Sequence, residues 1–229
     1  MSSVAGIRAR NRAAIEGEIL RVGREHLASH GAAGLSLRAV ARDLGMASSA
    51  VYRYVASRDE LLTRLIVTAY DAMADAVEGA LAALPATSGA DRRFRAIATA
   101  SRAWATANPH EYALIYGSPV PDYHAPAERT NDAGTRVPAM LTGVLAGIDR
   151  AGRRDTRRDR AALGATLDDP FFAGSGLTAG AVRRGFTAWI LVLGTISAEL
   201  FEQFGADTVG DWDAFFDAVV DDAMGIVTG

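Results

Sequence analysis

The side chains with the most evident chemistry lie between Ser36 and Tyr54, where arginine, serine and tyrosine recur. All three residue types donate hydrogen bonds to phosphate oxygens, and arginine and serine also bind the edges of bases. This segment is therefore expected to contact a polyanion. The candidate contacts within it are Arg38, Ser48, Ser49, Tyr52, Arg53 and Tyr54.

Several of these residues have a second interpretation that involves no ligand. Tyr54 could equally be a half-buried packing residue, as tyrosines often are, whereas a phosphate hydrogen bond is the favoured role for Tyr52. For Arg53 a base or phosphate contact is favoured over a solvated charge. Arg38 and Arg42 could contact phosphate or only water.

Catalytic and metal-binding patterns are not found. The chain has no cysteine and no lysine, which excludes thiolate sites and a Walker phosphate loop. His26 and His30 have metal-like spacing, but without an HExxH glutamate or a third ligand they are expected to be structural. The acids Asp168 and Asp169 precede a proline and are expected to be solvated. We therefore expect no enzyme, no cofactor and no metal site.

Aromatic and methionine side chains in the second half could line a cavity for an apolar molecule, although ordinary core packing would explain many of them. Tyr112 and Tyr116 lie four residues apart after Pro109, so they share a helix face and could orient a ligand. The alternative that both tyrosines pack inertly is left open. The candidate ligand-binding residues are Trp104, Tyr112, Tyr116, Met140, Phe171 and Trp189.

The elements that must position these residues are predicted to be helices throughout. Apolar residues recur at helical spacing, and no segment alternates long enough for a convincing strand. The first 64 residues hold ten arginines and six acids, whereas the remainder holds fourteen and twenty-one. A basic first part on an acidic second part suggests that only the first part meets a polyanion.

The segment from Ser36 to Tyr54 fits two short helices joined by a tight turn, which is a helix-turn-helix. Ser36 is a candidate N-cap, and Gly45 can adopt the left-handed backbone that the turn requires. Ser48 is expected to cap the second helix in place of Ala47. Val51 and Val55 would pack inward, leaving the polar side chains free to enter a DNA groove.

Breaks in composition divide the chain into four predicted parts. A flexible arm covers residues 1–10, and the helix-turn-helix domain covers 11–57, beginning with a helix from about Asn11 to His30. A connecting helix spans 58–84 after an N-cap at Ser57. A larger domain for ligand binding and dimerisation covers 91–229, with a loop at 118–127 and a helix at 129–150.

The last two helices carry more apolar surface than one body of this size needs, which favours a homodimer through a four-helix bundle. The longest apolar stretch, near Trp189–Ala198, is about half of the ~20 residues that a membrane span requires. With no signal-peptide pattern either, we expect a soluble cytoplasmic protein. The candidate dimer residues are Trp189, Leu193, Ile196, Leu200, Phe215, Phe216, Val219 and Val220.

The run from Tyr52 to Leu62 resembles the Tyr-x-(His/Tyr)-Phe-x-Ser-Lys-x-x-Leu-Leu signature of the TetR family of repressors, and His30–Ala41 is similar to that family's entry into its second helix. The resemblance covers about residues 11–64. Further on, Trp189-x4-Gly194 followed by Ala198-Glu199-Leu200-Phe201 is similar to the C-terminal domain of an actinobacterial-type subgroup. Val55 and Arg58 replace the family's usual phenylalanine and lysine, and Arg58 keeps a charge that could bind phosphate.

The resemblance implies an all-α fold with a three-helix DNA-binding head, a larger helical ligand-binding body and a homodimer formed by the last two helices. The implied function is a regulator that binds double-stranded operator DNA, interpreted here as a repressor released by a small, largely apolar effector. The alternative hypothesis is a helical ligand carrier or enzyme in which the head only packs. The basic head and the Tyr52–Tyr54 run favour the regulator.

Overall fold

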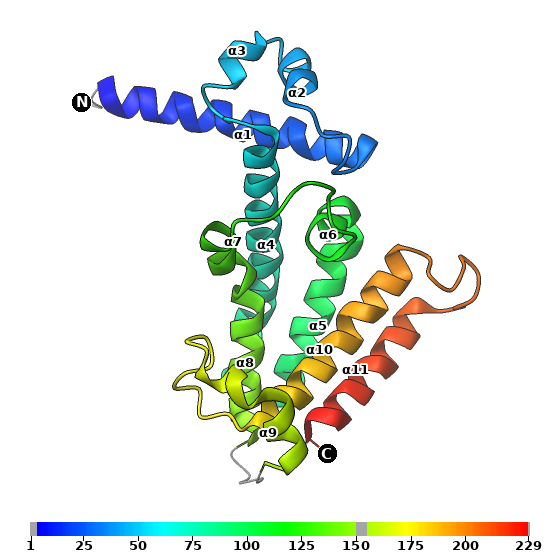
Figure 1. Ribbon diagram of the computed structural model, residues 1–229. Coiled ribbons are helices and arrows are strands. Elements are labelled where there is room, and N and C mark those ends of the chain that lie inside the picture. The colour runs from blue at the N-terminus through cyan, green and yellow to red at the C-terminus, as the bar shows by residue number, and fades with distance from the viewer. Residues whose placement is uncertain (1–3, 150–154, 229) are drawn as a thin grey trace. The chain divides into compact units, whose positions relative to one another are not determined.

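A computed structural model describes residues 4–149 and 155–228 of the chain, and every regular element in these ranges is helical (Figure 1). No helix in this described part is both long and apolar enough to cross a membrane. The expectation of an all-α fold is confirmed. Two compact units are present, which we call the head unit (Met1–Ala72 and Asn108–Gly134) and the body unit (Met73–Ala107 and Thr135–Gly229).

The head unit contains the helix-turn-helix and two further helices from later in the sequence. Its core is formed by buried residues from α1, α2, α3 and the start of α4, among them Ile19, Val40, Val51 and Leu61. The helices are α1 (Val4–His30), α2 (Leu37–Asp43), α3 (Ser48–Val51), the first part of α4 (Arg58–Ala82), α6 (Pro109–Tyr116) and α7 (Ala127–Gly134).

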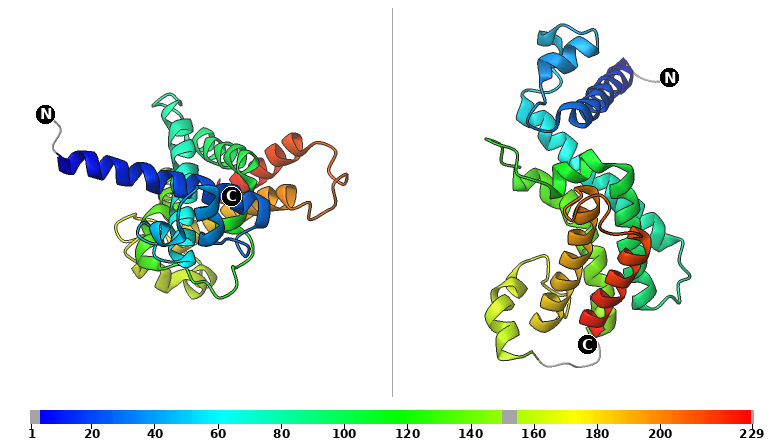
Figure 2. Two further views of the ribbon diagram at one scale, coloured as in Figure 1. Left: turned by 90° about the horizontal axis from the view of Figure 1, so that it is seen from above. Right: turned by 90° about the vertical axis from the view of Figure 1, so that its right-hand side faces the viewer.

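The body unit is built around α10 and α11, which run side by side and are joined by a loop (Figures 1 and 2). Helix α10 also contacts α5, α8 and α9, and α11 contacts α5 and α8. The elements are the rest of α4, α5 (Ala90–Ala107), α8 (Arg136–Asp149), α9 (Arg157–Leu163), the 3-10 helix η1 (Gly164–Asp168), α10 (Ala179–Leu200) and α11 (Trp212–Thr228).

Three expected element boundaries are corrected. Helix α1 begins at Val4, so residues 4–10 of the expected flexible arm are helical, and residues 1–3 lie outside the described ranges. Helix α3 ends at Val51, and the following residues to Tyr54 form a turn. The single helix expected over residues 129–150 is two helices, α7 and α8, with Thr135 between them. Pro138 explains this break, because its ring cannot fit against the carbonyl of Gly134 in a continuous helix.

The two compact units also group α6 and α7 with the helix-turn-helix, although both helices fall within the sequence range 91–229 that we assigned to ligand binding and dimerisation. Compactness alone does not assign function, so the functional division of the chain stays a prediction. The grouping matters for the head, because α6 packs against α1.

Candidate nucleic-acid interface and apolar pocket

The turn between α2 and α3 aims the polar residues of α3 outward. Gly45 has a φ of +65°, the left-handed backbone expected for the turn, and Met46 returns its amide to the carbonyl of Ala41. Val51 and Val55 are fully buried, which anchors α3 on the head core. Its opposite side is therefore open to solvent. The exposed candidate DNA contacts are Arg38, Ser48, Ser49, Tyr52 and Arg53.

The expected cap of α3 is corrected. Ala47 occupies the N-cap position and Ser48 is the first helical residue, so no side chain caps this helix. Ser36 does occupy the N-cap of α2, but its hydroxyl makes no capping bond. Ser48 and Ser49 are exposed at the start of α3.

Two of the candidate DNA contacts face the protein itself. Tyr54 is half-buried against the head core, and the guanidinium of Arg12 lies 5.5 Å from its ring centre. Arg58 donates from Nη2 to the carbonyl of Ala32 at 3.0 Å and from Nε to the carbonyl of Leu35 at 3.2 Å. These bonds tie the start of α4 to the turn after α1. For both residues the geometry supports a packing role beside the proposed contact with DNA.

The rings of the two histidines of α1 lie close together, and His26 also contacts α2. The Nε2 of buried His26 lies 2.7 Å from a carboxylate oxygen of Asp43 at the end of α2, while the rings of His26 and His30 lie 5.6 Å apart. The hydrogen bond from His26 lowers the pKa of the Asp43 carboxyl. This pair therefore joins α1 to α2 inside the head.

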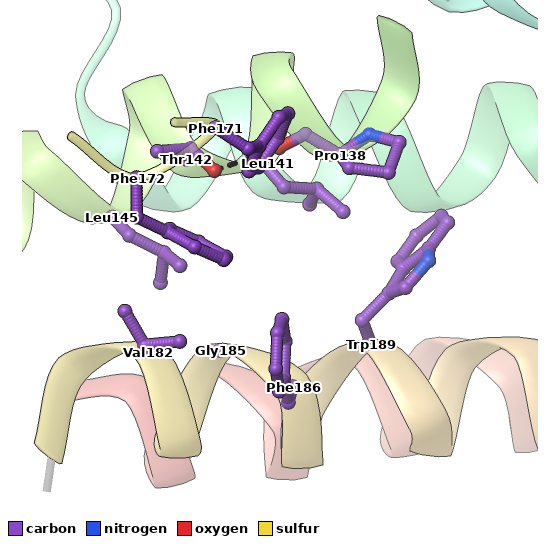
Figure 3. Close-up of a pocket in the computed structure, with 10 residues that line it drawn as sticks. All are labelled: Pro138, Leu141, Thr142, Leu145, Phe171, Phe172, Val182, Gly185, Phe186 and Trp189. Atoms are coloured by element: carbon purple, nitrogen blue, oxygen red, sulfur yellow. Dashed lines mark hydrogen bonds between the residues drawn. The ribbon is translucent and has the colours of Figure 1, made fainter. Parts of the chain in front are cut away.

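An apolar pocket lies in the body unit between α8 and α10 (Figure 3). It encloses about 420 Å³ of space, part of which is open to solvent. Thr142 supplies the polar side-chain oxygen of the lining, and its hydroxyl donates to the carbonyl of Pro138 at 2.9 Å. The lining residues are Pro138, Leu141, Thr142, Leu145, Phe171, Phe172, Val182, Gly185, Phe186 and Trp189.

Aromatic rings close one side of this pocket. Phe171 and Phe172 approach from the turn after η1, with ring centres 4.8 Å apart, and Phe172 meets Phe186 edge-on at 6.0 Å. The carboxylate of Asp169 accepts the amide of Phe171 at 2.8 Å and so holds that turn. Such a surface suits the stacking of a flat apolar molecule.

The sequence identified two of the lining residues in advance, Phe171 and Trp189. Trp104, Tyr112, Tyr116 and Met140 are not among the residues that line this pocket, and their role in ligand binding stays a prediction. The missed residues of α10 share a signal that was present, since Val182, Gly185, Phe186 and Trp189 recur at intervals of three or four. The α8 residues Pro138, Leu141, Thr142 and Leu145 have the same spacing, but neither pattern shows that these two helices, about 45 residues apart in the sequence, face each other.

Tyr112 and Tyr116 belong to the head unit, where they form an aromatic cluster with Tyr70. The Tyr112 and Tyr116 rings lie 5.2 Å apart, and Tyr70 meets Tyr116 edge-on at 6.2 Å. Tyr112 is fully buried, and burial raises the pKa of the Tyr116 phenol, with the nearby Tyr70 and Tyr112 adding to the rise. These contacts support the inert-packing interpretation of both tyrosines.

The candidate dimer residues divide into core and surface. Ile196, Phe216 and Val220 are buried within the single chain, where α10 packs on α11, α5 and α8. Trp189, Leu193, Leu200 and Val219 are half-buried, and Phe215 is exposed. Helix α10 also exposes apolar side chains that were not predicted, with 67% of Ile190 and 44% of Phe186 open to solvent.

A tight glycine turn, a buried anchor at Val51 and an exposed face of serine, tyrosine and arginine together define a helix-turn-helix protein of the DNA-binding class. Comparison with known proteins agrees. Residues 19–65 match the family described as bacterial regulatory proteins of the tetR family, and residues 94–223 match the tetracyclin repressor-like C-terminal domain. The chain belongs to the TetR family of transcriptional regulators.

Curated relatives are similar along almost the whole chain. The HTH-type transcriptional regulators Rv1816 of Mycobacterium tuberculosis and Mb1846 of Mycobacterium bovis are each 46% identical over an alignment of 217 residues, and the match covers 89% of this chain and 88% of theirs. Among solved structures, the regulatory protein SCO4313 is 32% identical with a TM-score of 0.78, covering 95% of this chain and 98% of its own. A tetR-family protein from Rhodococcus RHA1, at 19% identity and a TM-score of 0.57, shares the fold over 93% of this chain and 96% of its own.

Proposed function

We propose that this regulator is a repressor that binds operator DNA as a homodimer and leaves it when a small, uncharged, largely apolar molecule occupies the α8–α10 pocket. The observation that carries the proposal is the pairing of an exposed polar α3 face with an apolar pocket in a separate unit of the same chain. The first feature suits DNA and the second suits an effector.

The DNA half of the proposal rests on the chemistry of α3. Tyr52 and Arg53 project from its end, and serine hydroxyls lie at its start, so both ends can reach phosphates while Arg53 can read a base edge. Two copies would bind half-sites separated by one helical turn of DNA, roughly 34–36 Å. A pseudo-palindromic operator follows from that symmetry.

The effector half rests on the pocket lining. No charged side chain is among the lining residues, and a charged group placed there would lose its hydration without a partner. An uncharged molecule with aromatic or aliphatic surface fits this lining. Release from DNA then requires that the effector bind one conformation of the dimer more tightly than the other.

Selection of duplexes from a random pool with the full-length protein, followed by footprinting, tests the DNA half. On the selected duplex, Arg53→Ala should weaken binding by about 1–3 kcal/mol if Arg53 reads a base. If Arg53 contacts phosphate, the variant should weaken binding to all duplexes by the same factor. Arg21→Ala is the matched control, because the Arg21 guanidinium pairs with Glu18 and Glu25 within α1. Unchanged affinity in Arg53→Ala would remove this residue from the interface.

The neutral fluorescent probe N-phenyl-1-naphthylamine tests the effector half. Its emission should rise with the wild-type chain and less with Phe172→Ser, whereas Phe204→Ser changes an exposed aromatic outside the pocket and should behave as wild type. Neutral apolar compounds that displace the probe should then weaken binding to the selected duplex. If the displacing compounds leave DNA affinity unchanged, the pocket does not control release.

A further inference from the structure

The segment that joins α6 to α7 is part of the core of the head unit. Leu114 at the end of α6, and Val120 and Tyr123 in the following loop, pack against the buried cluster of α1 to α4. The Tyr123 hydroxyl lies 2.9 Å from Oγ1 of Thr63, which is itself buried on α4. A loop with three prolines is thus fastened to the helix that follows the helix-turn-helix.

Helix α7 continues this attachment through charge. Arg129 donates from Nη1 and Nη2 to the two carboxylate oxygens of Glu60 in the first turn of α4, with Nη2 at 3.1 Å from Oε1. Arg64, one turn further along α4, donates to Oε1 of the same carboxylate at 2.6 Å. These bonds lower the pKa of the Glu60 carboxyl, and the largest cause is the hydrogen bond from Arg129. Glu60 is therefore shared by two guanidinium groups from different helices.

Further ion pairs connect α4 through α1 to Tyr54, which follows α3 in the sequence. Nη1 of Arg64 lies 3.7 Å from Oε1 of Glu16 on α1, and Nε of Arg12 lies 3.0 Å from the same oxygen. The Arg12 guanidinium in turn lies over the ring of Tyr54, three residues after α3 ends. We call this series Arg129–Glu60–Arg64–Glu16–Arg12 the charge chain.

We propose that Glu60 and Arg129 are positioning residues for DNA binding: through the charge chain, α7 holds α4 and α1 in the arrangement that presents α3 to the operator. Neither residue is placed in the DNA interface, and both act through Arg64, Glu16 and Arg12. The proposal rests on the proposed binding of operator DNA by α3.

Two properties separate the charge chain from isolated surface ion pairs, which contribute little on their own. Its signs alternate, so each inner group has two partners of opposite charge. The central side chains of Glu60 and Arg64 are only 19% and 27% exposed, so salt screens them less than it screens open pairs.

The sharpest test is Glu60→Gln, because a positioning role and simple electrostatics predict opposite changes in its affinity for DNA. Removing a negative charge from a DNA-binding unit reduces its repulsion of DNA, so simple electrostatics predicts tighter binding. Positioning predicts weaker binding, by about three- to fivefold, from the loss of coupled pairs. Glu18→Gln is the matched control, because Glu18 pairs only with Arg21 of the same helix in the described contacts and should leave affinity unchanged or slightly tighter.

A second group of variants changes Arg129, the partner of Glu60 at the α7 end of the charge chain. Arg129→Gln should weaken binding to a similar degree, Arg129→Lys should restore part of the loss, and Arg129→Gln combined with Glu60→Gln should cost no more than either change alone. Arg136→Gln removes an arginine that pairs with Asp75 and Glu78 in the body unit and should leave affinity unchanged. The salt dependence of binding should match that of wild type in all these variants, because no phosphate contact is removed.

The measurement is the affinity of each purified full-length variant for the duplex selected with wild-type protein, with helicity and unfolding midpoint measured alongside. Weaker binding by Glu60→Gln and Arg129→Gln at unchanged helicity supports the proposal. Affinity equal to or tighter than wild type in Glu60→Gln overturns it while leaving DNA binding intact. A wild-type chain that selects no duplex overturns the proposed function and this inference with it.

Discussion

Arg53 and Arg58 lie five residues apart in the head unit but have different surroundings. Arg53 is exposed beyond α3, whereas Arg58 donates to carbonyls of the turn between α1 and α2 and has a side chain that is 32% exposed. A carbonyl that loses its donor in a partly buried site costs stability, whereas an exposed charge that loses only water costs little. The two arginines should therefore separate stability from DNA binding.

Arg58→Ala should lower the free energy of unfolding of the head unit by about 1–3 kcal/mol, because the carbonyls of Ala32 and Leu35 lose their charged donor. Amide hydrogen exchange of the buried residues Val40 and Val51 measures this loss. Arg53→Ala should leave the same exchange rates unchanged and serves as the control. Equal protection in the two variants would contradict the structural role of Arg58.

At the scale of elements, the packing of α8 on α10 depends on a glycine. A methyl group at Gly185 would overlap the side chain of Leu145, whereas Gly194 on the same helix has open space around it. Gly194→Ala should raise the free energy of unfolding by about 0.5–1 kcal/mol through helix propensity alone. Gly185→Ala should raise the free energy of unfolding by less than this, or lower it, because Leu145 has to move from its place in the pocket lining.

Unfolding of the two alanine variants in denaturant compares the positions directly. The displaced Leu145 side chain would also reduce the space for the probe N-phenyl-1-naphthylamine, so Gly185→Ala should bind it more weakly than Gly194→Ala. Equal stability and equal probe binding in both variants would show that α8 and α10 do not approach closely at this point.

The contact between α9 and α10 depends on the carboxylate of Asp159. Asp159 caps its own helix by accepting the Thr156 amide at 3.0 Å, and it accepts Nε of Arg183 on α10 at 2.6 Å. These bonds, led by the one from Arg183, hold the pKa of the Asp159 carboxyl well below its usual range. The contact between α9 and α10 should therefore weaken when acid protonates this carboxylate.

Since the pKa of Asp159 is lower in the folded state than the unfolded value of about 4, its stabilisation is complete above that pH and is lost as the pH falls below it. Thermal unfolding from pH 7 to pH 2.5 should therefore show a smaller loss of stability in Asp159→Asn than in wild type, starting from a lower midpoint at pH 7. Asp222→Asn, at an exposed position of α11, should retain the wild-type profile. Parallel profiles for Asp159→Asn and wild type would contradict the role of this carboxylate.

At the scale of the whole molecule, the proposed dimer should use the exposed apolar residues of α10 and α11 rather than the buried ones. Ile190→Asp places a charge on the most exposed large apolar residue of the body unit and should give folded monomers, because a dimer contact there would bury an unpaired charge. Sedimentation velocity at micromolar concentration measures the change.

Ile7→Asp is the control, because it makes the same substitution at an exposed position of α1, in the head unit. That variant should sediment as wild type. A wild-type chain that is monomeric at this concentration would contradict the dimer, and a dimeric Ile190→Asp would move the interface away from this face of α10.

The helix-turn-helix was predictable from the sequence because its signals are local. Gly45 has the left-handed backbone that only a few residue types tolerate, and Val51 and Val55, four residues apart in the sequence, are both buried in the head core. The division between α7 and α8 was also within reach, since Pro138 disfavours a continuous helix. Each of these features depends on residues fewer than ten positions apart.

What the sequence by itself determined, then, is the all-helical class, the DNA-binding head and the apolar character of the last two helices. Only the tertiary structure decided that Ile196, Phe216 and Val220 are core while Ile190 is surface, that Leu141 and Phe186 share a pocket, and that Arg129 reaches Glu60. Helical periodicity shows which side chains share a face, but it carries no information about which distant helix covers that face. Contacts between residues 45 or more positions apart depend on how the helices pack together, so they can be identified only from the tertiary structure.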